Sequence, residues 1–202
     1  PYVYSNLMGN ESGRIIFDGS ATISDGLGNL VAEGPRFSFQ SFGLCVAEIE
    51  LAPSSPAPTG PAEGMAGTSG QAFGSRGQKW ENEPNEEFAR AVALGLYDYL
   101  RKSKAKGFAI SLSGGADSAA CALLVRLMVE LGSKELGWAA FSRSLGLDAT
   151  DVATAMPKLL RTLYQGTVHS SKITRDAAAA VAKAVGATHG DVDIQPIYEA
   201  YK

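Results

Sequence analysis

The chain has 202 residues with 18 basic and 21 acidic side chains, so its formal charge of −3 offers no net positive field to attract nucleic acid. Hydrophobic residues make up 45% of it, which excludes a disordered chain, and no apolar run reaches the ~20 residues that cross a bilayer. The two cysteines, Cys45 and Cys121, form no CxxC pair. Neither a disulfide framework nor a zinc site is predicted, and a reducing, cytoplasmic setting is expected.

Residues 1–52 are predicted to be β structure. Short β-branched or aromatic runs alternate there with turn residues, and the expected strands are 2–4, 14–17, 21–23 and 45–49. Cys45 falls in the last of these, within residues 44–51, and is interpreted as a small buried residue. The chain opens on a strand-like segment without an initiator Met, so a fragment of a longer protein is expected.

A change of composition marks the next segment. Residues 53–79 hold four prolines and six glycines with almost no large apolar side chain, so they cannot bury a core. The sequence therefore predicts an exposed linker at 53–79, between a first domain at 1–52 and a second at 80–202.

The second domain is predicted to alternate helices and strands. Asn85 is a candidate cap for a helix that ends at Gly107 and carries its apolar face on Phe88, Val92, Leu96 and Tyr99. Residues 108–112 form an expected strand, residues 113–118 a loop, and the next expected helix carries Leu123, Leu124, Leu127, Met128 and Leu131. Cys121 in that helix is interpreted as a packing residue.

Beyond this helix the pattern is less regular. Residues 132–158 are expected to be partly helical, with Pro157 ending any helix at Met156. A second strand is expected at 159–164 and a third at 189–193, separated by a helix that Ser170 or Ser171 caps and Gly186 ends. That helix carries Ile173, Ala177, Val181 and Val185. Alternating strands and helices of this kind predict a parallel, doubly wound α/β sheet.

One motif lies between the first strand and helix of this sheet: Ser111-Leu112-Ser113-Gly114-Gly115-Ala116-Asp117-Ser118. Two glycines let successive N–H groups turn toward one anion, and the following helix N-terminus also favours phosphate. The hydroxyls of Ser113 and Ser118 can donate to phosphate oxygens, whereas the Asp117 carboxylate fits there as a ligand of Mg²⁺ or as a helix cap. The lysine of a Walker loop is absent.

Residues 113–118 resemble the pyrophosphate loop of the ATP pyrophosphatases, a superfamily that includes NAD synthetases, GMP synthetase, asparagine synthetase and tRNA-thiolating enzymes. Residues 164–178, 186–189 and 193–196 are similar to the ligase domain of glutamine-dependent NAD⁺ synthetases. One position departs from that pattern, since His169 stands where the family usually has Asn. Residues 4–11, 17–20 and 32–39 resemble the closing strands of the nitrilase-type glutaminase domain in the same enzymes.

The resemblance implies the end of a nitrilase-like α/β sandwich followed by a Rossmann-like sheet of the ATP-pyrophosphatase, or adenine nucleotide hydrolase-like, type. The implied reaction converts nicotinate adenine dinucleotide to NAD⁺ through an adenylated intermediate, with ATP and Mg²⁺, nitrogen from glutamine or ammonia, and AMP and pyrophosphate as products. Ser113 is the implied ligase active residue and Asp117 the metal ligand. The implied nucleotide-binding set is Ser111, Leu112, Ser113, Gly114, Gly115, Ala116, Asp117, Ser118, Thr167 and Arg175.

Several alternatives stay open at this point. The chain is also compatible with another adenylating amidotransferase that carries an SGGxDS loop, and with a non-catalytic nucleotide-binding fragment. Arg175 could equally lie on a solvent-exposed helix face or contact the nucleotide. The family's Glu-Lys-Cys glutaminase triad is not recognised in this chain, a homo-oligomeric parent protein is implied, and the fragment is expected to be inactive alone.

Overall fold

The computed structural model describes residues 1–11, 13, 15–50 and 83–201. Within it the chain divides into two compact units, Pro1–Ala91 and Val92–Lys202. The expected linker, residues 53–79, and both of its boundaries lie outside the described residues, so the division into domains at those positions stays a prediction. Within the described part of the chain, no helix combines the length and the apolar character that a membrane span needs.

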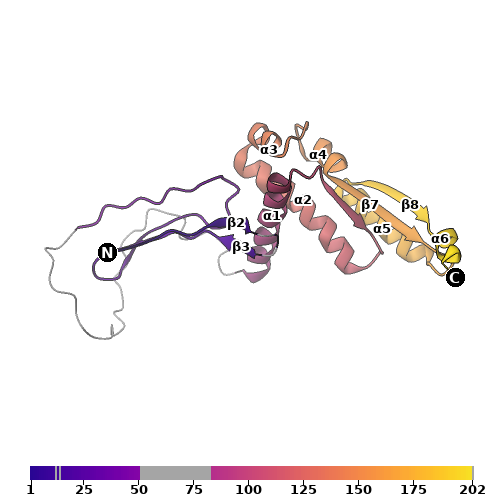
Figure 1. The fold of residues 1–202 in the computed structure, drawn as a ribbon, viewed down its shortest axis with the longest axis horizontal. Coiled ribbons are helices and arrows are strands. Elements are labelled where there is room, and N and C mark those ends of the chain that lie inside the picture. The colour runs from indigo at the N-terminus through magenta and orange to yellow at the C-terminus, as the bar shows by residue number, and fades with distance from the viewer. Residues whose placement is uncertain (12, 14, 51–82, 202) are drawn as a thin grey trace. The chain divides into compact units, whose positions relative to one another are not determined.

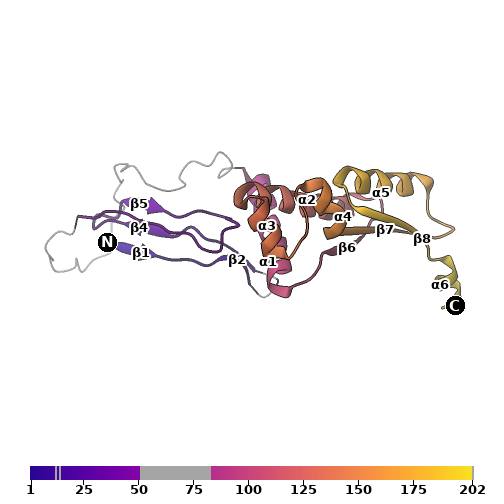
Figure 2. The same cartoon turned by 90° about the horizontal axis from the view of Figure 1, so that it is seen from above.

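The first unit is built from antiparallel strands. One sheet has the order β1-β4-β5, formed by β1 (Tyr2–Tyr4), β4 (Thr22–Ser24) and β5 (Leu30–Glu33), as Figure 2 shows. A separate hairpin pairs β2 (Met8–Glu11) with β3 (Ile15–Asp18). The buried apolar side chains of this unit include Ile23, Ala32, Phe37 and Phe39.

The structure corrects part of the strand prediction for this unit. The β-branched and aromatic runs did not predict β2 and β5, which only the resemblance of residues 4–11 and 32–39 to closing strands suggested. Residues 45–49, expected as the last strand, pair with no other strand among the described residues. Residues 25–29 form the turn between β4 and β5, in which the Asp25 carboxylate accepts the backbone N–H groups of Leu27 (2.8 Å) and Asn29 (2.9 Å).

The second unit is an α/β structure around a parallel sheet, which confirms the predicted fold class (Figure 1). Its three strands, β6 (Phe108–Ser111), β7 (Leu160–Gly166) and β8 (Thr188–Asp193), lie in the order β6-β7-β8. The crossover helices α2 (Ala116–Leu136) and α5 (Lys172–Val185) contact the sheet and one another, so they cover the same face. Among the described strands the order does not reverse.

Helix α1 (Pro84–Ser103) confirms the predicted helix but not the predicted buried face. Phe88 and Tyr99 are mostly exposed, whereas the buried side chains include Leu94, Tyr97 and Leu100. The Tyr97 ring stacks on Phe141 with 5.9 Å between ring centroids, and its hydroxyl donates to Ser144 Oγ at 2.9 Å. Apolar residues occur on both faces of this helix, so packing and not periodicity selects the face. The helix begins at Pro84, so Asn85 is inside it, and it ends at Ser103, before Lys104 with its positive φ of 58° and not at Gly107.

The segment 132–158 contains the end of α2, all of α3 (Trp138–Leu145) and most of α4 (Val152–Leu159). The prediction that Pro157 ends the helix at Met156 is wrong, because α4 continues to Leu159. A proline removes one helical hydrogen bond, and here the buried side chains of Ala155, Met156 and Leu159 compensate for that loss by packing.

Asp151 forms the N-cap of α4 in a capping box: its carboxylate accepts the Thr154 N–H at 2.8 Å. These hydrogen bonds, with the Thr154 backbone first, lower the pKa of Asp151 below its ordinary value of 3.8. A carboxyl whose folded pKa is lowered stabilises the fold above the unfolded pKa and loses that contribution as the pH falls. The Asp151→Asn variant keeps a neutral cap. We therefore expect its thermal stability to fall less than that of wild type between pH 5 and about pH 3. Equal losses in the two proteins would contradict this role.

The predicted limits of α5 are confirmed. Ser171 is its N-cap, with the side-chain oxygen accepting the Thr174 N–H at 3.1 Å, and Gly186 ends it in the left-handed conformation with φ 76°. The expected apolar face is again displaced, because Ile173 is exposed while Ala178 and Ala182 are buried together with Val185. A final helix, α6 (Gln195–Ala200), follows β8.

Candidate functional site

The predicted phosphate loop lies at the carboxyl end of β6. Residues 112–115 connect that strand to α2, which begins at Ala116. Residues 116–118 are therefore helical and not part of the loop as predicted. The Ser113 N–H donates to Ser118 Oγ at 3.3 Å, and the Gly115 N–H donates to Ser113 Oγ at 3.2 Å. The Ser118 hydroxyl donates to Gly115 O at 3.2 Å. The side chains of Ser113 and Ser118 therefore hold the loop in its conformation by hydrogen bonds among residues 113–118 themselves.

Gly114 sits where no other residue fits. Its φ is +82°, and a Cβ built on it would lie 2.3 Å from Thr174 O and 2.8 Å from Thr174 Cα. The loop backbone thus packs directly against the first turn of α5. Glycine is required here for two independent reasons, the left-handed backbone and the close approach.

The N-terminus of α2 remains open to a ligand. Its N-cap is Gly115, which has no side chain to accept the first-turn N–H groups, and the structure records no side-chain cap among the described residues. The first N–H groups of a helix have no intrahelical acceptor, and together with the helix dipole they favour an anion. Asp117 in this turn is exposed.

A second loop, residues 167–171, follows β7 and approaches the same place. The Thr167 N–H donates to Ser170 Oγ at 2.9 Å, and Thr167 Oγ1 accepts the His169 N–H at 3.3 Å. The start of α5 is fixed by a chain of hydroxyls, with Tyr164 OH 2.8 Å from Thr174 Oγ1 and Thr174 Oγ1 3.0 Å from Ser171 Oγ. Since Thr174 also touches Gly114, the two loops are packed as one unit.

A hollow of about 450 Å³ opens between these loops, a volume sufficient for a small-molecule ligand. Parallel pairing places the carboxyl ends of β6 and β7 at one edge of the sheet, which is where α/β proteins bind ligands. Ser111 Oγ donates to Gln165 Oε1 at 2.8 Å across this edge. The lining residues are Ser111, Leu112, Ser113, Tyr164, Gln165, His169, Ser170, Ser171, Thr174 and Ile194.

The sequence-predicted residues take different places around the hollow. Ser111 and Ser113 line it and are exposed, whereas the Leu112 side chain is buried in the core, so only its backbone can face a ligand. The members of the set that do not line it are Gly114, Gly115, Ala116, Asp117, Ser118, Thr167 and Arg175. All but the last lie in the loop or turn that borders it.

Arg175 instead has structural partners. Its Nε lies 3.3 Å from Asp191 Oδ2, and its guanidinium lies 5.6 Å from the centroid of the Tyr164 ring. These contacts favour the interpretation of Arg175 as a residue of the α5 surface. Gln165, His169 and Thr174 were not in the predicted set, although they stand in the segment that carries the family resemblance; only the three-dimensional pairing of β6 with β7 brings them to the loop.

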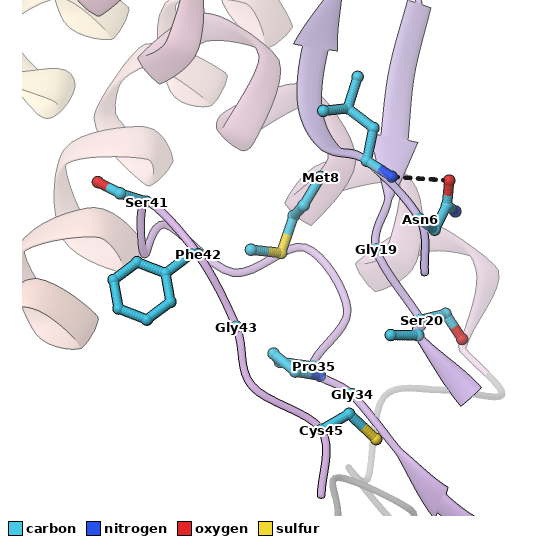
Figure 3. Close-up of a pocket in the computed structure, with 12 residues that line it drawn as sticks. Asn6, Met8, Gly19, Ser20, Gly34, Pro35, Ser41, Phe42, Gly43 and Cys45 are labelled. Carbon is cyan, nitrogen blue, oxygen red and sulfur yellow. Dashed lines mark hydrogen bonds between the residues drawn. The ribbon is translucent and has the colours of Figure 1, made fainter. Parts of the chain in front are cut away.

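A smaller hollow of about 240 Å³ lies in the first unit, lined by residues that include Met8, Gly19, Pro35, Phe42 and Cys45 (Figure 3). Cys45 is half-buried and not in a strand, so its interpretation as a buried strand residue is wrong. Cys121 is exposed, which likewise contradicts a packing role. Among the described residues that line this hollow, no Lys, His, Asp or Glu stands ready to activate the thiol.

Burial, and then the Glu33 carboxylate, raise the pKa of the Cys45 thiol above its ordinary value of 9.0. Because the thiolate is the reactive form, we expect a disulfide reagent at pH 8 to modify Cys45 more slowly than the exposed Cys121. The variants Cys45→Ala and Cys121→Ala allow each rate to be measured alone. Faster modification of Cys45, or glutamate release from glutamine that Cys45→Ala abolishes, would contradict this description.

Comparison with known proteins gives a consistent result. The family model described as NAD synthase matches residues 88–202. The glutamine-dependent NAD(+) synthetase of Arabidopsis thaliana is 30% identical, and the match covers 98% of this chain and 31% of that protein. The enzyme of the same name from Oryza sativa subsp. indica is 29% identical, and the match again covers 98% of this chain and 31% of that protein. The chain thus spans about a third of the length of these curated relatives.

Solved structures agree with this fold. The glutamine-dependent NAD(+) synthetase from Cytophaga hutchinsonii is 33% identical and superposes with a TM-score of 0.74, covering 100% of this chain and 32% of its own. The enzyme of the same name from Acinetobacter baumannii, solved in complex with ADP, is 20% identical and superposes with a TM-score of 0.57. The match covers 98% of this chain and 29% of that one, and at this identity it supports the fold alone.

Proposed function

This chain belongs to the NAD synthase family, and from that membership we propose that it supplies the ATP site of a glutamine-dependent NAD⁺ synthase. The proposed reaction amidates nicotinate adenine dinucleotide to NAD⁺ through an adenylated intermediate, with AMP and pyrophosphate as products. The observation that supports this most strongly is the convergence of the loop after β6 and the loop after β7 on one hollow at the carboxyl edge of the sheet.

The chemistry assigns distinct tasks to this hollow. A carboxylate is a poor electrophile, so one of its oxygens first attacks the α-phosphorus of ATP and pyrophosphate leaves; ammonia then attacks the acyl carbon and AMP leaves. The protein's part is to stabilise charge on the departing pyrophosphate and to align the ammonia. The open N–H groups at the start of α2 fit the first task. Because Ser118 donates to Gly115 O, Ser113 is the donor in the 3.2 Å hydrogen bond between the two hydroxyls, and it would have to rotate away from Ser118 to donate to a phosphate oxygen.

Magnesium is the metal that this chemistry calls for, and the residues present fit it. Mg²⁺ commonly takes one or two protein carboxylates and completes its shell with phosphate oxygens and water. The exposed Asp117 carboxylate, in the first turn of α2 beside the proposed pyrophosphate position, is the group that would hold it. The ion would neutralise phosphate charge there. Arg175 has no part in this proposal.

We propose further that the first unit is the end of a nitrilase-like glutaminase domain that supplies the ammonia. Catalysis therefore has to be measured in the longest natural protein that contains this chain. By itself the 202-residue chain is expected not to complete ligation, since its second unit contributes a three-stranded sheet in which the strand order does not reverse.

An isotope experiment tests the reaction. Nicotinate adenine dinucleotide labelled with ¹⁸O in its carboxylate is incubated with ATP, Mg²⁺ and ammonia, and the products are read by mass spectrometry. We expect NAD⁺ and an AMP that carries one ¹⁸O. Label in inorganic phosphate, with ADP as product, would contradict adenylation. Turnover of a different carboxylic acid alone would favour another adenylating amidotransferase, and ATP binding without any turnover would favour a non-catalytic role.

A further inference from the structure

The hollow lacks a permanent positive charge. Among the described residues that line it there is no Lys or Arg, and His169 is the one side chain that can become cationic. The nearby basic groups have carboxylate partners: Arg175 pairs with Asp191, and Lys172 pairs with Asp176 at 2.5 Å. A polyphosphate bound in the hollow would therefore contact backbone N–H groups. Among the lining side chains, at most one could be cationic.

The backbone of His169 is fixed by hydrogen bonds in the loop, whereas its imidazole ring forms none among the described residues. Its N–H donates to Thr167 Oγ1 at 3.3 Å, and the neighbouring Val168 N–H donates to Gln195 Oε1 at 3.3 Å. Within the part of the chain that the structure describes, the His169 ring has no hydrogen-bond partner. The other histidine, His189, differs, because its Nδ1 lies 2.9 Å from Thr162 Oγ1 between β7 and β8.

We propose that His169 takes up a proton when the polyphosphate of ATP binds and then serves as the one cationic side chain that lines the hollow. An imidazole has a pKa of about 6.5 in model peptides, and a neighbouring anion raises it. Binding is then coupled to proton uptake, and the affinity for nucleotide falls as the pH rises from 6 to 8. This inference rests on the proposed function, since it requires ATP in this hollow.

Other titratable groups lie on the elements around the hollow. Tyr164, on β7, shares its hydroxyl with Thr174. The carboxylates on the adjoining elements are Asp117 on α2, Asp176 on α5, Asp191 and Asp193 on β8, and Glu199 on α6. The terminal phosphate of ATP also titrates near pH 6. The pH dependence that reports His169 is therefore the difference between wild type and a variant that lacks the imidazole.

Titration calorimetry with ATP and Mg²⁺ tests the proposal in the longest natural protein that contains this chain. Each titration is run at pH 6, 7 and 8 in two buffers of different ionisation enthalpy, so that the number of protons taken up is measured directly. The variants are His169→Asn, which keeps a polar side chain but cannot be protonated, His169→Lys, which stays cationic, and His189→Gln as the matched control.

We expect wild type and His189→Gln to take up more protons than His169→Asn, by about half a proton at pH 7, and to lose about tenfold more affinity between pH 6 and pH 8. His169→Lys should bind tightly without that pH dependence. Equal proton uptake and equal pH dependence in wild type and His169→Asn would overturn this inference and leave the proposed function intact. Failure of all four proteins to bind ATP at any pH would overturn both.

Discussion

Gly114→Ala should strongly weaken ATP binding. The residue has a φ of +82°, and the added methyl group would lie 2.3 Å from Thr174 O, which is backbone and cannot rotate away. The left-handed conformation costs about 1–2 kcal/mol and the overlap about 1–3 kcal/mol more, so the loop must leave its position against α5. We expect affinity for ATP and Mg²⁺ to fall by at least about 30-fold, since each 1.4 kcal/mol is tenfold.

Gly146→Ala is the matched control for this experiment. Gly146 also has a positive φ, of 60°, but a Cβ there would meet nothing within 4 Å. It ends α3, away from the loops that border the hollow. The control should therefore lose stability by about 1 kcal/mol without loss of affinity. Calorimetry that shows ATP bound equally well by Gly114→Ala and the control would exclude the loop from the nucleotide site.

Asp117→Asn should weaken Mg²⁺-dependent ATP binding by about 1–3 kcal/mol, the usual range for removing one partner of a charge-assisted interaction. That corresponds to roughly 5-fold to 150-fold in affinity. The variant keeps the size of the side chain and its place in the first turn of α2, so the change isolates the charge. Affinity for ATP in the presence of a chelator should change little, because the carboxylate acts through the metal.

Asp148→Asn serves as the comparison for charge removal. The Asp148 side chain is fully exposed between α3 and α4, outside the hollow, with Lys158 3.5 Å away. It should bind ATP and Mg²⁺ as wild type does. An Asp117→Asn protein with unchanged affinity in the presence of Mg²⁺ would remove Asp117 from the proposed metal site.

Local signals predicted much of the second unit. Helix α5 begins and ends at the expected places. The Ser171 side chain accepts an N–H of the first turn, and Gly186, with a positive φ, follows the last turn. The three parallel strands follow from short apolar runs separated by helices. The motif at residues 111–118 also lies where the sequence placed it, between a strand and a helix. Each of these depends on neighbours within a few residues.

The features that were missed depend on distant residues. Helix α1 carries apolar side chains on two faces, and only the packing of Tyr97 on Phe141 selects between them. Residues 45–49 have the alternation of a strand but no strand partner among the described residues. Nothing near Gly114 in the sequence reveals that Thr174 will lie against it. The lining of the hollow by His169 and Gln165 follows from the parallel pairing of β7 with β6.

The central claim is that ATP binds where the loops after β6 and β7 meet, and hydrogen exchange read by mass spectrometry tests it most directly. The measurement compares the longest natural protein that contains this chain with and without ATP and Mg²⁺. We predict slower exchange in peptides that cover residues 112–119 and 166–171, with no change in peptides that cover 1–50. Slower exchange confined to the β1–β5 region, or unchanged exchange at residues 112–119 when ATP is bound, would contradict this location of the site.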